Sequence, residues 1–300
     1  MHEGPRVSQA LLHVPKDLGP RLAQRVLPPE ERTRLAAYAL KDAGLGVDAF
    51  GTRKDALAAA YALGYLLHEH YFRVQSRGHA SIPTHGAAVI AGNHSGVLPF
   101  DAMMVATDVF RNTWPPRLVR YMVDYFVYRI PFLGVFFRGV GQVPGTRANF
   151  DGLVREGHIV GVFPEGAAAL GKPAERRYEL YPFSPGHVEL AARHRVPVIP
   201  FGLVGAEEQQ HMVANLAPLA KILRLPYVPI TTTFPWLGPL GLLPKPVRYF
   251  IEYGEPIHVD PAVLSSVRIR EREVERVRTA VRDLLRRGLA WRKEFERGRS

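Results

Sequence analysis

Short apolar segments recur through the middle of the chain, and glycine, proline or polar residues that favour turns bound each of them. Such segments are typical of buried strands. The clearest cover residues 87–91, 117–123, 158–163, 196–204 and 248–253. Segments with helical spacing lie between most of them, and strands that alternate with helices favour a parallel sheet. The pattern therefore predicts an α/β fold: a single domain with a mainly parallel central sheet flanked by helices.

Helical patterns also occupy both ends of the chain and predict helical N-terminal and C-terminal additions. We expect helices over residues 30–40 and 54–72, and a last helix over 269–295 with one apolar and one arginine-rich face. Thr146 and Ser184 suit the starts of two helices between strands. The chain then divides into a helical N-terminal region, an α/β domain and a basic amphipathic C-terminal helix, over residues 1–53, 54–260 and 261–300.

Composition narrows the class of protein. Hydrophobic residues make up 47% and charged residues 22%, which is typical of a globular chain. The absence of cysteine excludes disulfides and thiolate metal sites. The net charge of +11 predicts an acidic partner, but no aromatic-interleaved basic stretch or known motif points to nucleic acid. We find neither a signal peptide nor an uncharged helical run of the ~20 residues that a membrane span needs.

One histidine follows the first predicted strand directly. The strand ends at Gly92 and Asn93, His94 comes next, and Asp101 stands at the start of a helical segment. A carboxylate can hold one ring nitrogen of a histidine while the other nitrogen takes a proton, as a general base requires. Alternatively, His94 is an ordinary loop residue and Asp101 a helix N-cap. On this stretch alone the two interpretations stay open.

Two regions outside this stretch suggest contact with lipid. Residues 226–244 carry no charge but include five prolines, so they form either a buried irregular loop or one that dips into a membrane. The arginine-rich face of the last helix is either a solvated surface or a contact with anionic lipid. Both alternatives remain open.

Three blocks of the chain resemble motifs of the glycerolipid acyltransferases, the phosphatidic-acid-synthesising (PlsC) type and its neutral-lipid relatives. They are Asn93–His94 with Asp101, Phe163–Gly166 and Val196–Pro200, in the family's order. The resemblance covers roughly residues 57–259. It implies a transfer of an acyl group from acyl-CoA or an acyl carrier protein to a lipid alcohol.

The resemblance also implies roles for residues. His94 would be the general base and Asp101 would orient it. Glu165 and Gly166 would contact the acceptor alcohol, and residues 196–200 would shape a substrate pocket. Asn93, Ser95 and Gly96 flank the histidine and are expected to contact substrate, with backbone amides after Gly96 stabilising the oxyanion. Because the serine of Gly92–Gly96 stands in the wrong place for a nucleophile elbow, we expect direct attack by the acceptor.

Two departures from the family pattern bear on the substrate. Six residues separate His94 from Asp101, where the family usually has four. A further block of the family aligns with Gly139–Pro144. This alignment puts Gly145 where phosphate-using members carry an arginine, and only Arg138 and Arg147 lie near enough in sequence to replace it. The acceptor is therefore either a phosphorylated glycerolipid or an uncharged one.

These observations predict an acyltransferase (EC 2.3.1) that acts peripherally on the cytoplasmic inner face of the cell membrane. We expect a lipid acceptor, an acyl-CoA or acyl carrier protein donor and an anionic membrane surface as partners, and neither a bound cofactor nor a metal nor nucleic acid. The alternative is a non-catalytic lipid-binding or lipid-transfer protein with a degenerate acyltransferase site. Chain length of the acyl group and oligomeric state are not predicted.

Overall fold

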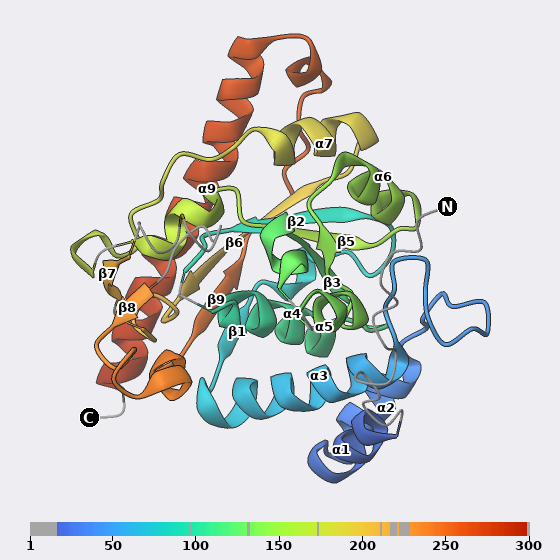
Figure 1. Ribbon diagram of the computed structural model, residues 1–300. Coiled ribbons are helices and arrows are strands. Elements are labelled where there is room, and N and C mark those ends of the chain that lie inside the picture. Colours follow the sequence, from blue (N-terminus) through green and yellow to red (C-terminus); the bar gives the residue numbers. More distant parts are fainter. Residues whose placement is uncertain are drawn as a thin grey trace, which may run out of the picture.

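The computed structural model describes residues 17–298 except 96–97, 131–132, 173, 211, 217–220 and 222–228. Seven strands form one sheet in the order β1-β9-β6-β2-β5-β3-β4 (Figure 1). Their bounds are β1 Gln75–Arg77, β2 Ala88–Gly92, β3 Val119–Val123, β4 Val143–Pro144, β5 Ile159–Val162, β6 Val198–Val204 and β9 Phe250–Tyr253. A separate two-stranded sheet pairs β7 (Met212–Asn215) with β8 (Pro229–Thr231).

Neighbouring strands of the large sheet run parallel, except that β6 and β9 are antiparallel. β1 and β9 therefore run opposite to the other five strands. Five strands coincide with the predicted apolar segments, which confirms the mainly parallel central sheet. The hydrophobic pattern does not predict β1 and β4, because strands of three and two residues are too short to show a period.

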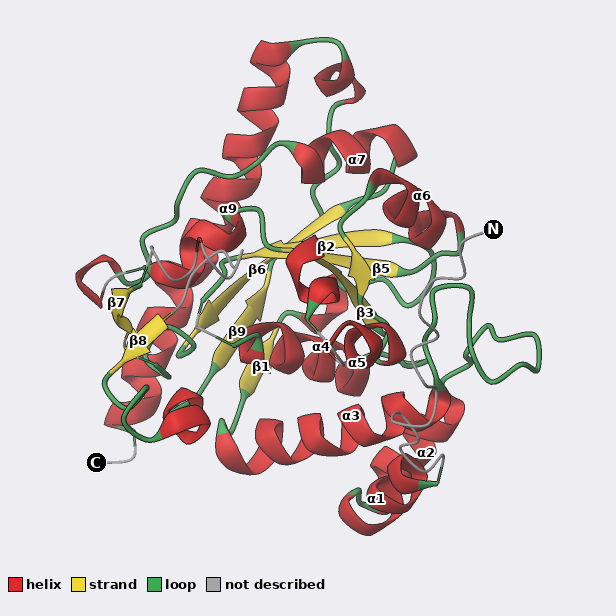
Figure 2. Cartoon of the chain, viewed as in Figure 1, coloured by secondary structure: helices red, strands yellow, loops and turns green. Residues whose placement is uncertain are grey.

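Helices cover both faces of the sheet (Figure 2). The α-helices are α1 Leu18–Val26, α2 Pro29–Ala37, α3 Lys54–Leu66, α4 Phe100–Asn112, α5 Leu133–Gly139, α6 Arg147–Arg155, α7 Gly186–His194 and α9 Val267–Arg297. A π-helical turn, η2, covers Leu67–Tyr71. The 3₁₀ helices are η3 His79–Ser81, η4 Tyr125–Arg129, η5 Gly166–Gly171, η6 Ala174–Arg176, η7 Gly238–Leu242 and η8 Pro261–Leu264.

The two faces of the sheet bury separate sets of apolar side chains. In β2, Ala88 and Ile90 pack toward α4, whereas Val89 and Ala91 pack toward α6, α7 and α9. This alternation follows from the period of two along a strand. All four side chains are buried, so β2 lies at the centre of the molecule. α1 and α2 pack outside α3, in a third apolar cluster.

Thr146 caps α6 as predicted, whereas α7 begins at Gly186 with Pro185 as its N-cap and no side-chain cap, so Ser184 does not cap that helix. Thr146 Oγ1 accepts a hydrogen bond from Asn149 N at 3.2 Å and caps α6. Ser266 Oγ accepts from Ile269 N at 3.3 Å at the start of α9. Capping oxygens of this kind satisfy amides that have no partner inside the helix. Among the described residues, no helix is long and apolar enough to cross a membrane.

The crossovers of the sheet change direction beside β2. After β2 the chain crosses toward β3, whereas after β5 it crosses to β6 on the other side of β2. In open α/β sheets, ligands bind outside the carboxyl ends of the strands where the crossovers change direction. The segments that follow β2 and β5, residues 93–95 and 163–166, meet at this position.

Candidate active site

The structure brings His94 and Asp101 together. His94 Nδ1 lies 2.6 Å from Asp101 Oδ2. The same carboxylate oxygen accepts a hydrogen bond from Ser95 N at 2.9 Å, and Oδ1 accepts from Ala102 N at 2.7 Å. Because a carboxylate only accepts, Nδ1 carries the hydrogen, and the lone pair of Nε2 remains for another proton. The imidazole is 14% exposed, whereas the Asp101 side chain is fully buried.

An aromatic ring covers one face of the imidazole. Phe163, the first residue after β5, stacks on His94 with ring centroids 4.1 Å apart and planes only 9° apart. The Phe163 ring also touches Phe201 edge-on from β6. The histidine is therefore held by a hydrogen bond at its edge and by a ring against its face.

Glu165 has a structural role that the sequence does not predict. Oε1 accepts a hydrogen bond from His94 N at 3.1 Å, and Oε2 accepts from Tyr181 N at 2.7 Å. Lys172 Nζ lies 3.4 Å from the same Oε2 and 3.2 Å from Glu207 Oε1. These contacts give Glu165 a structural role, and its contact with an acceptor alcohol stays a prediction. Glu165 joins the ends of β2 and β5.

Lys172 is a buried residue of this site that the motif comparison missed. Its side chain is only 4% exposed and lies between two carboxylates that are equally buried. Burial raises the pKa of Glu207, and the charge of Lys172 and a hydrogen bond from Tyr178 N partly oppose the rise. Lys172 thus offsets the repulsion between Glu165 and Glu207. No signal in the sequence marks it, because the fold brings Glu207 to it from 35 residues further along the chain.

Asn93 also has a structural role. Its Nδ2 donates to Leu203 O at 3.0 Å, and its Oδ1 accepts from Leu203 N at 2.8 Å. The side-chain amide, which is fully buried, thereby continues the pairing of β2 with β6 beyond the last strand residue. Contact of Asn93 with substrate stays a prediction.

Three further residues predicted to contact substrate are Ser95, Gly96 and Gly166. Ser95 Oγ is buried and has no hydrogen-bond partner among the described residues. Gly96, predicted to contact substrate, lies outside the described residues. Gly166 is exposed with φ of 65°, a conformation that favours glycine, and a Cβ there would meet nothing within 4 Å. Gly166 therefore leaves space open beside the Phe163–Glu165 segment.

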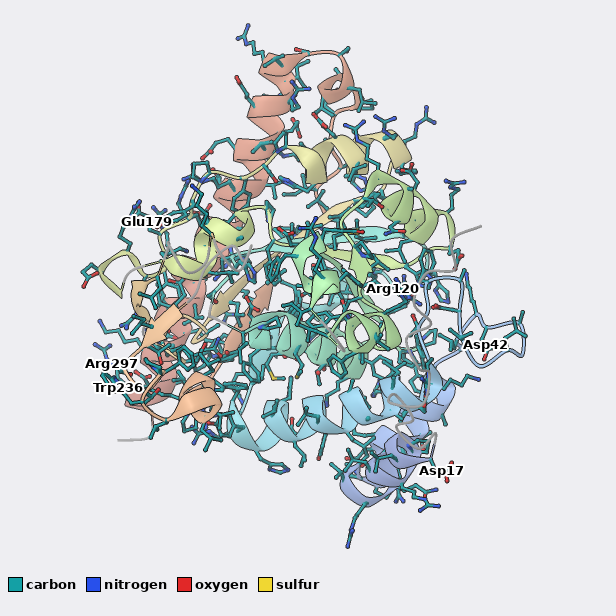
Figure 3. The ribbon with its side chains drawn as sticks, in the orientation of Figure 1. Asp17, Asp42, Arg120, Glu179, Trp236 and Arg297 are labelled. Carbon is teal, nitrogen blue, oxygen red and sulfur yellow. The ribbon has the colours of Figure 1, made fainter. Side chains whose placement is uncertain are left out.

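Neither arginine proposed for phosphate binding lies beside His94. Arg138 is near the end of α5, and its side chain packs against Gly51. The loop at Gly51 is tied to the start of β3, because Arg120 forms a buried ion pair with Asp48 (Figure 3). Arg138 is thus at the amino end of the parallel strands, opposite the site. Arg147 begins α6 after β4, three strands from β2, or about 14 Å at the usual strand spacing.

The segment 196–200 lies mostly in the core. Val198 and Ile199 are buried in β6 and pair with Val89 and Ile90 near the middle of the sheet. These side chains face the two helix layers and not the carboxyl end of the strands. The role of residues 196–200 in shaping a substrate pocket therefore stays a prediction.

A second buried carboxylate, Asp108, anchors the helix that carries Asp101. It accepts hydrogen bonds from His68 Nε2 and His79 Nε2, both at 3.1 Å, and from Ser76 Oγ at 2.6 Å and Tyr253 OH at 2.8 Å. Burial raises the pKa of Asp108, but the hydrogen bonds and charges of the two histidines outweigh it and hold that pKa well below its usual value. α4 is therefore fixed to η2, β1 and β9, which also fixes its first turn.

Comparison with known proteins fits this geometry. Residues 73–204, which include β2, β5 and the His94–Asp101 pair, match the family model described as Acyltransferase. The chain carries an acyltransferase domain. This domain contains all three blocks on which the resemblance to glycerolipid acyltransferases depends, and that resemblance is confirmed.

Relatives of the acyltransferase domain come from bacteria and vertebrates. An uncharacterized protein of Mycobacterium tuberculosis is 38% identical over 188 residues, which are 62% of this chain and 52% of that protein. A human protein named DGAT1/2-independent enzyme synthesizing storage lipids is 24% identical over 208 residues, 69% of this chain and 59% of that protein. The chain spans about half the length of the curated relatives it matches.

A solved structure shares the fold. The crystal structure of the 1-acyl-sn-glycerophosphate (LPA) acyltransferase PlsC from Thermotoga maritima matches with a TM-score of 0.51 and 16% sequence identity. The match covers 89% of this chain and 91% of that chain. The arrangement of strands and helices around the acyltransferase domain is therefore that of a PlsC-like α/β fold.

Proposed function

We propose that the protein is an O-acyltransferase that moves a fatty acyl group from acyl-CoA or an acyl carrier protein to a lipid alcohol. In the proposed reaction, His94 Nε2 takes the hydroxyl proton of the acceptor as the hydroxyl oxygen attacks the thioester carbonyl carbon. The C–S bond then breaks, and the leaving thiolate takes the proton back from His94. The observation that carries this proposal is the pairing of His94 Nδ1 with buried Asp101, which leaves Nε2 as the proton acceptor.

The acceptor in this proposal is an uncharged lipid alcohol. Recognition of a phosphate needs arginine, lysine or a set of free backbone amides. Among the described residues, Lys172 is already occupied by two glutamates, and Arg138 and Arg147 lie away from His94. The relatives named DGAT1/2-independent enzyme synthesizing storage lipids support the same substrate class.

We further propose that the enzyme works on the inner face of the cell membrane. Trp236 is 83% exposed, and Leu237, Leu240 and Leu243 are 60%, 69% and 59% exposed in the uncharged segment around η7. Large apolar side chains gathered on one loop are typical of a lipid or protein contact. Figure 3 shows Trp236 at the edge of the molecule.

The C-terminal helix supports this proposal less than its charge predicts. Its arginines form ion pairs with nearby acids, among them Arg272 with Glu273 and Arg282 with Glu275. Paired charges attract an anionic surface less than free ones do. α9 lies on the sheet through its apolar side, where Val277, Val281 and Leu285 are buried. The proposed membrane contact therefore rests on the apolar segment around η7.

An acceptor panel tests the proposed activity. Purified protein is incubated with radiolabelled acyl-CoA or acyl carrier protein, and with diacylglycerol, monoacylglycerol, a long-chain alcohol, glycerol 3-phosphate or lysophosphatidate. We expect labelled product with the uncharged acceptors. Product with the phosphorylated acceptors only would contradict the substrate class. If no acceptor gives product while the protein moves labelled lipid between vesicles, the proposed transferase is wrong and the lipid-transfer alternative is supported.

A further inference from the structure

Three rings from three adjacent strands form one stack that ends at His94. Phe163 lies parallel to the imidazole, and Tyr121 of β3 lies parallel to Phe163, with centroids 5.1 Å apart and planes 7° apart. Because β5 lies between β2 and β3, Phe163 is the middle ring. The stack therefore runs from the interior of the sheet to the proposed general base.

A glycine in β5 makes room for this stack. Gly161 pairs in register with Tyr121, and residues 161 and 163 point to the same face of the sheet. A Cβ at Gly161 would lie 2.6 Å from ring carbons Cδ1 and Cε1 of Tyr121. The Tyr121 ring thus occupies the space above Gly161, and in that position it meets the ring of Phe163.

Tyr121 contacts Phe163 through its ring and not through its hydroxyl. Tyr121 is buried, and its hydroxyl has no hydrogen-bond partner among the described residues. A buried hydroxyl without a partner opposes folding. Burial, and the nearby charge of Asp101, raise the pKa of Tyr121 well above its usual value, so the ring is neutral at working pH.

We propose that Phe163, supported by Tyr121, is a positioning residue that fixes the plane of the His94 imidazole for proton transfer. This inference rests on the proposed function, since the plane of the ring matters only if His94 moves a proton. The hydrogen bond to Asp101 selects Nδ1 but still allows the ring to rock about that bond. The flat face of Phe163 prevents this rocking, so the Nε2 lone pair keeps one direction. The same face stabilises the imidazolium that forms during transfer.

Two pairs of variants distinguish the effect of an aromatic ring from the effect of apolar packing. Phe163→Leu keeps an apolar side chain but removes the ring, whereas Phe163→Tyr keeps the ring. Tyr121→Leu and Tyr121→Phe form the second pair. We expect both leucine variants to lower kcat, Phe163→Leu by about 10²-fold, with little change in KM, because misdirected proton transfer affects the reaction and not ground-state binding. Phe163→Tyr and Tyr121→Phe should stay within about threefold of the parent enzyme.

Nitrogen NMR of His94 gives a readout that needs no turnover. In the parent protein, the ¹⁵N shifts of the ring should show one protonated nitrogen, Nδ1. In Phe163→Leu the Nε2 shift should change, because a ring that rocks about its bond to Asp101 no longer holds Nε2 in fixed surroundings, while Nδ1 stays protonated. Unchanged ring shifts and unchanged kcat in Phe163→Leu would overturn the proposal.

The two readouts also keep this inference separate from the proposed function. If the parent protein transfers no acyl group, the proposed function fails, and the ¹⁵N shifts still decide whether Phe163 holds the ring. If thermal melting shows that Phe163→Leu is unfolded, the comparison of Tyr121→Leu with Tyr121→Phe decides the question. Equal ring shifts in that pair would then overturn the proposal.

Discussion

Asp101 reaches His94 at 2.6 Å although it stands seven positions later in the chain. The pairing depends on where a strand ends and a helix begins, not on the length of the loop between them. His94 follows the buried strand β2, and Asp101 lies in the first turn of α4, which Asp108 anchors at its other end. The longer spacing than in the family pattern is therefore compatible with the same geometry.

Removal of either member of this pair tests the proposed chemistry. We expect His94→Ala to lower kcat by at least the ~10²–10⁴-fold typical of a lost general base. Asp101→Asn should also lower kcat, because an amide at this position no longer selects the Nδ1–H tautomer. Steady-state kinetics measures both effects, and thermal melting verifies folding. A folded His94→Ala variant that keeps more than about a tenth of the activity would rule out His94 as the base.

Lys172→Met should destabilise the protein by about 3–5 kcal/mol, because it leaves Glu165 and Glu207 buried without their shared cation. Urea unfolding measures the change in the free energy of unfolding. Lys245→Met, at an exposed lysine, is the matched control and should change it by less than about 0.5 kcal/mol. A loss as small in Lys172→Met as in the control would contradict the role assigned to Lys172.

The folding stability of Lys172→Met should also change with pH in a way that Glu207 explains. The pKa of Glu207 is raised above its usual value of 4.5 in the folded protein, so the folded state binds more protons than the unfolded state just above that pH. Stability contributed by this group is then present at low pH and is lost as pH rises through the folded pKa. The charge of Lys172 opposes the rise in the pKa of Glu207. Lys172→Met should therefore lose more stability than the parent protein as pH rises from 5 to 8. Urea midpoints at these pH values provide the test.

The buried His187 should make the protein less stable as pH decreases, which is opposite to the trend expected for Glu207. Burial lowers its pKa from 6.5 to about 4, partly opposed by its hydrogen bond to Ser184 O. The unfolded chain therefore takes up a proton that the folded protein refuses, and stability falls as pH decreases from 6.5 toward 4. His187→Gln should flatten this part of the stability curve, whereas His85→Gln, at an exposed histidine, should not. Equal slopes for both variants would argue against this assignment.

The apolar segment around η7 can be tested with vesicles. The double variant Trp236→Ala/Leu240→Ala should lose most binding to anionic liposomes in a sedimentation assay, because both side chains are exposed anchors. Leu45→Ala is a matched control: Leu45 is 80% exposed and follows Asp42, which Figure 3 places on the opposite side of the molecule from Trp236. Binding that responds equally to both changes would exclude η7 as the contact.

The sequence predicts those parts of the fold and site that depend on neighbouring residues. The five longer strands, the alanine-rich α3 and the capped α6 follow from local period and capping. The roles of Asn93 and Glu165 do not, because their partners, Leu203 N of β6 and Tyr181 N, come together with them only in the folded chain. A motif shows which residues recur together, whereas their burial and partners depend on the assembled sheet.

The position of β9 has a consequence for synthesis of the chain on the ribosome. Among the described residues, β1 pairs with β9 alone, and the cross-strand pair Arg77–Glu252 joins residues 175 positions apart. At about 5–20 residues per second, β1 emerges about 9 to 35 s before its partner exists. Until then, β6 also presents an unpaired edge, which is a site for aggregation. We therefore expect nascent chains that stop before residue 250 to need chaperones, although they already contain the whole acyltransferase domain.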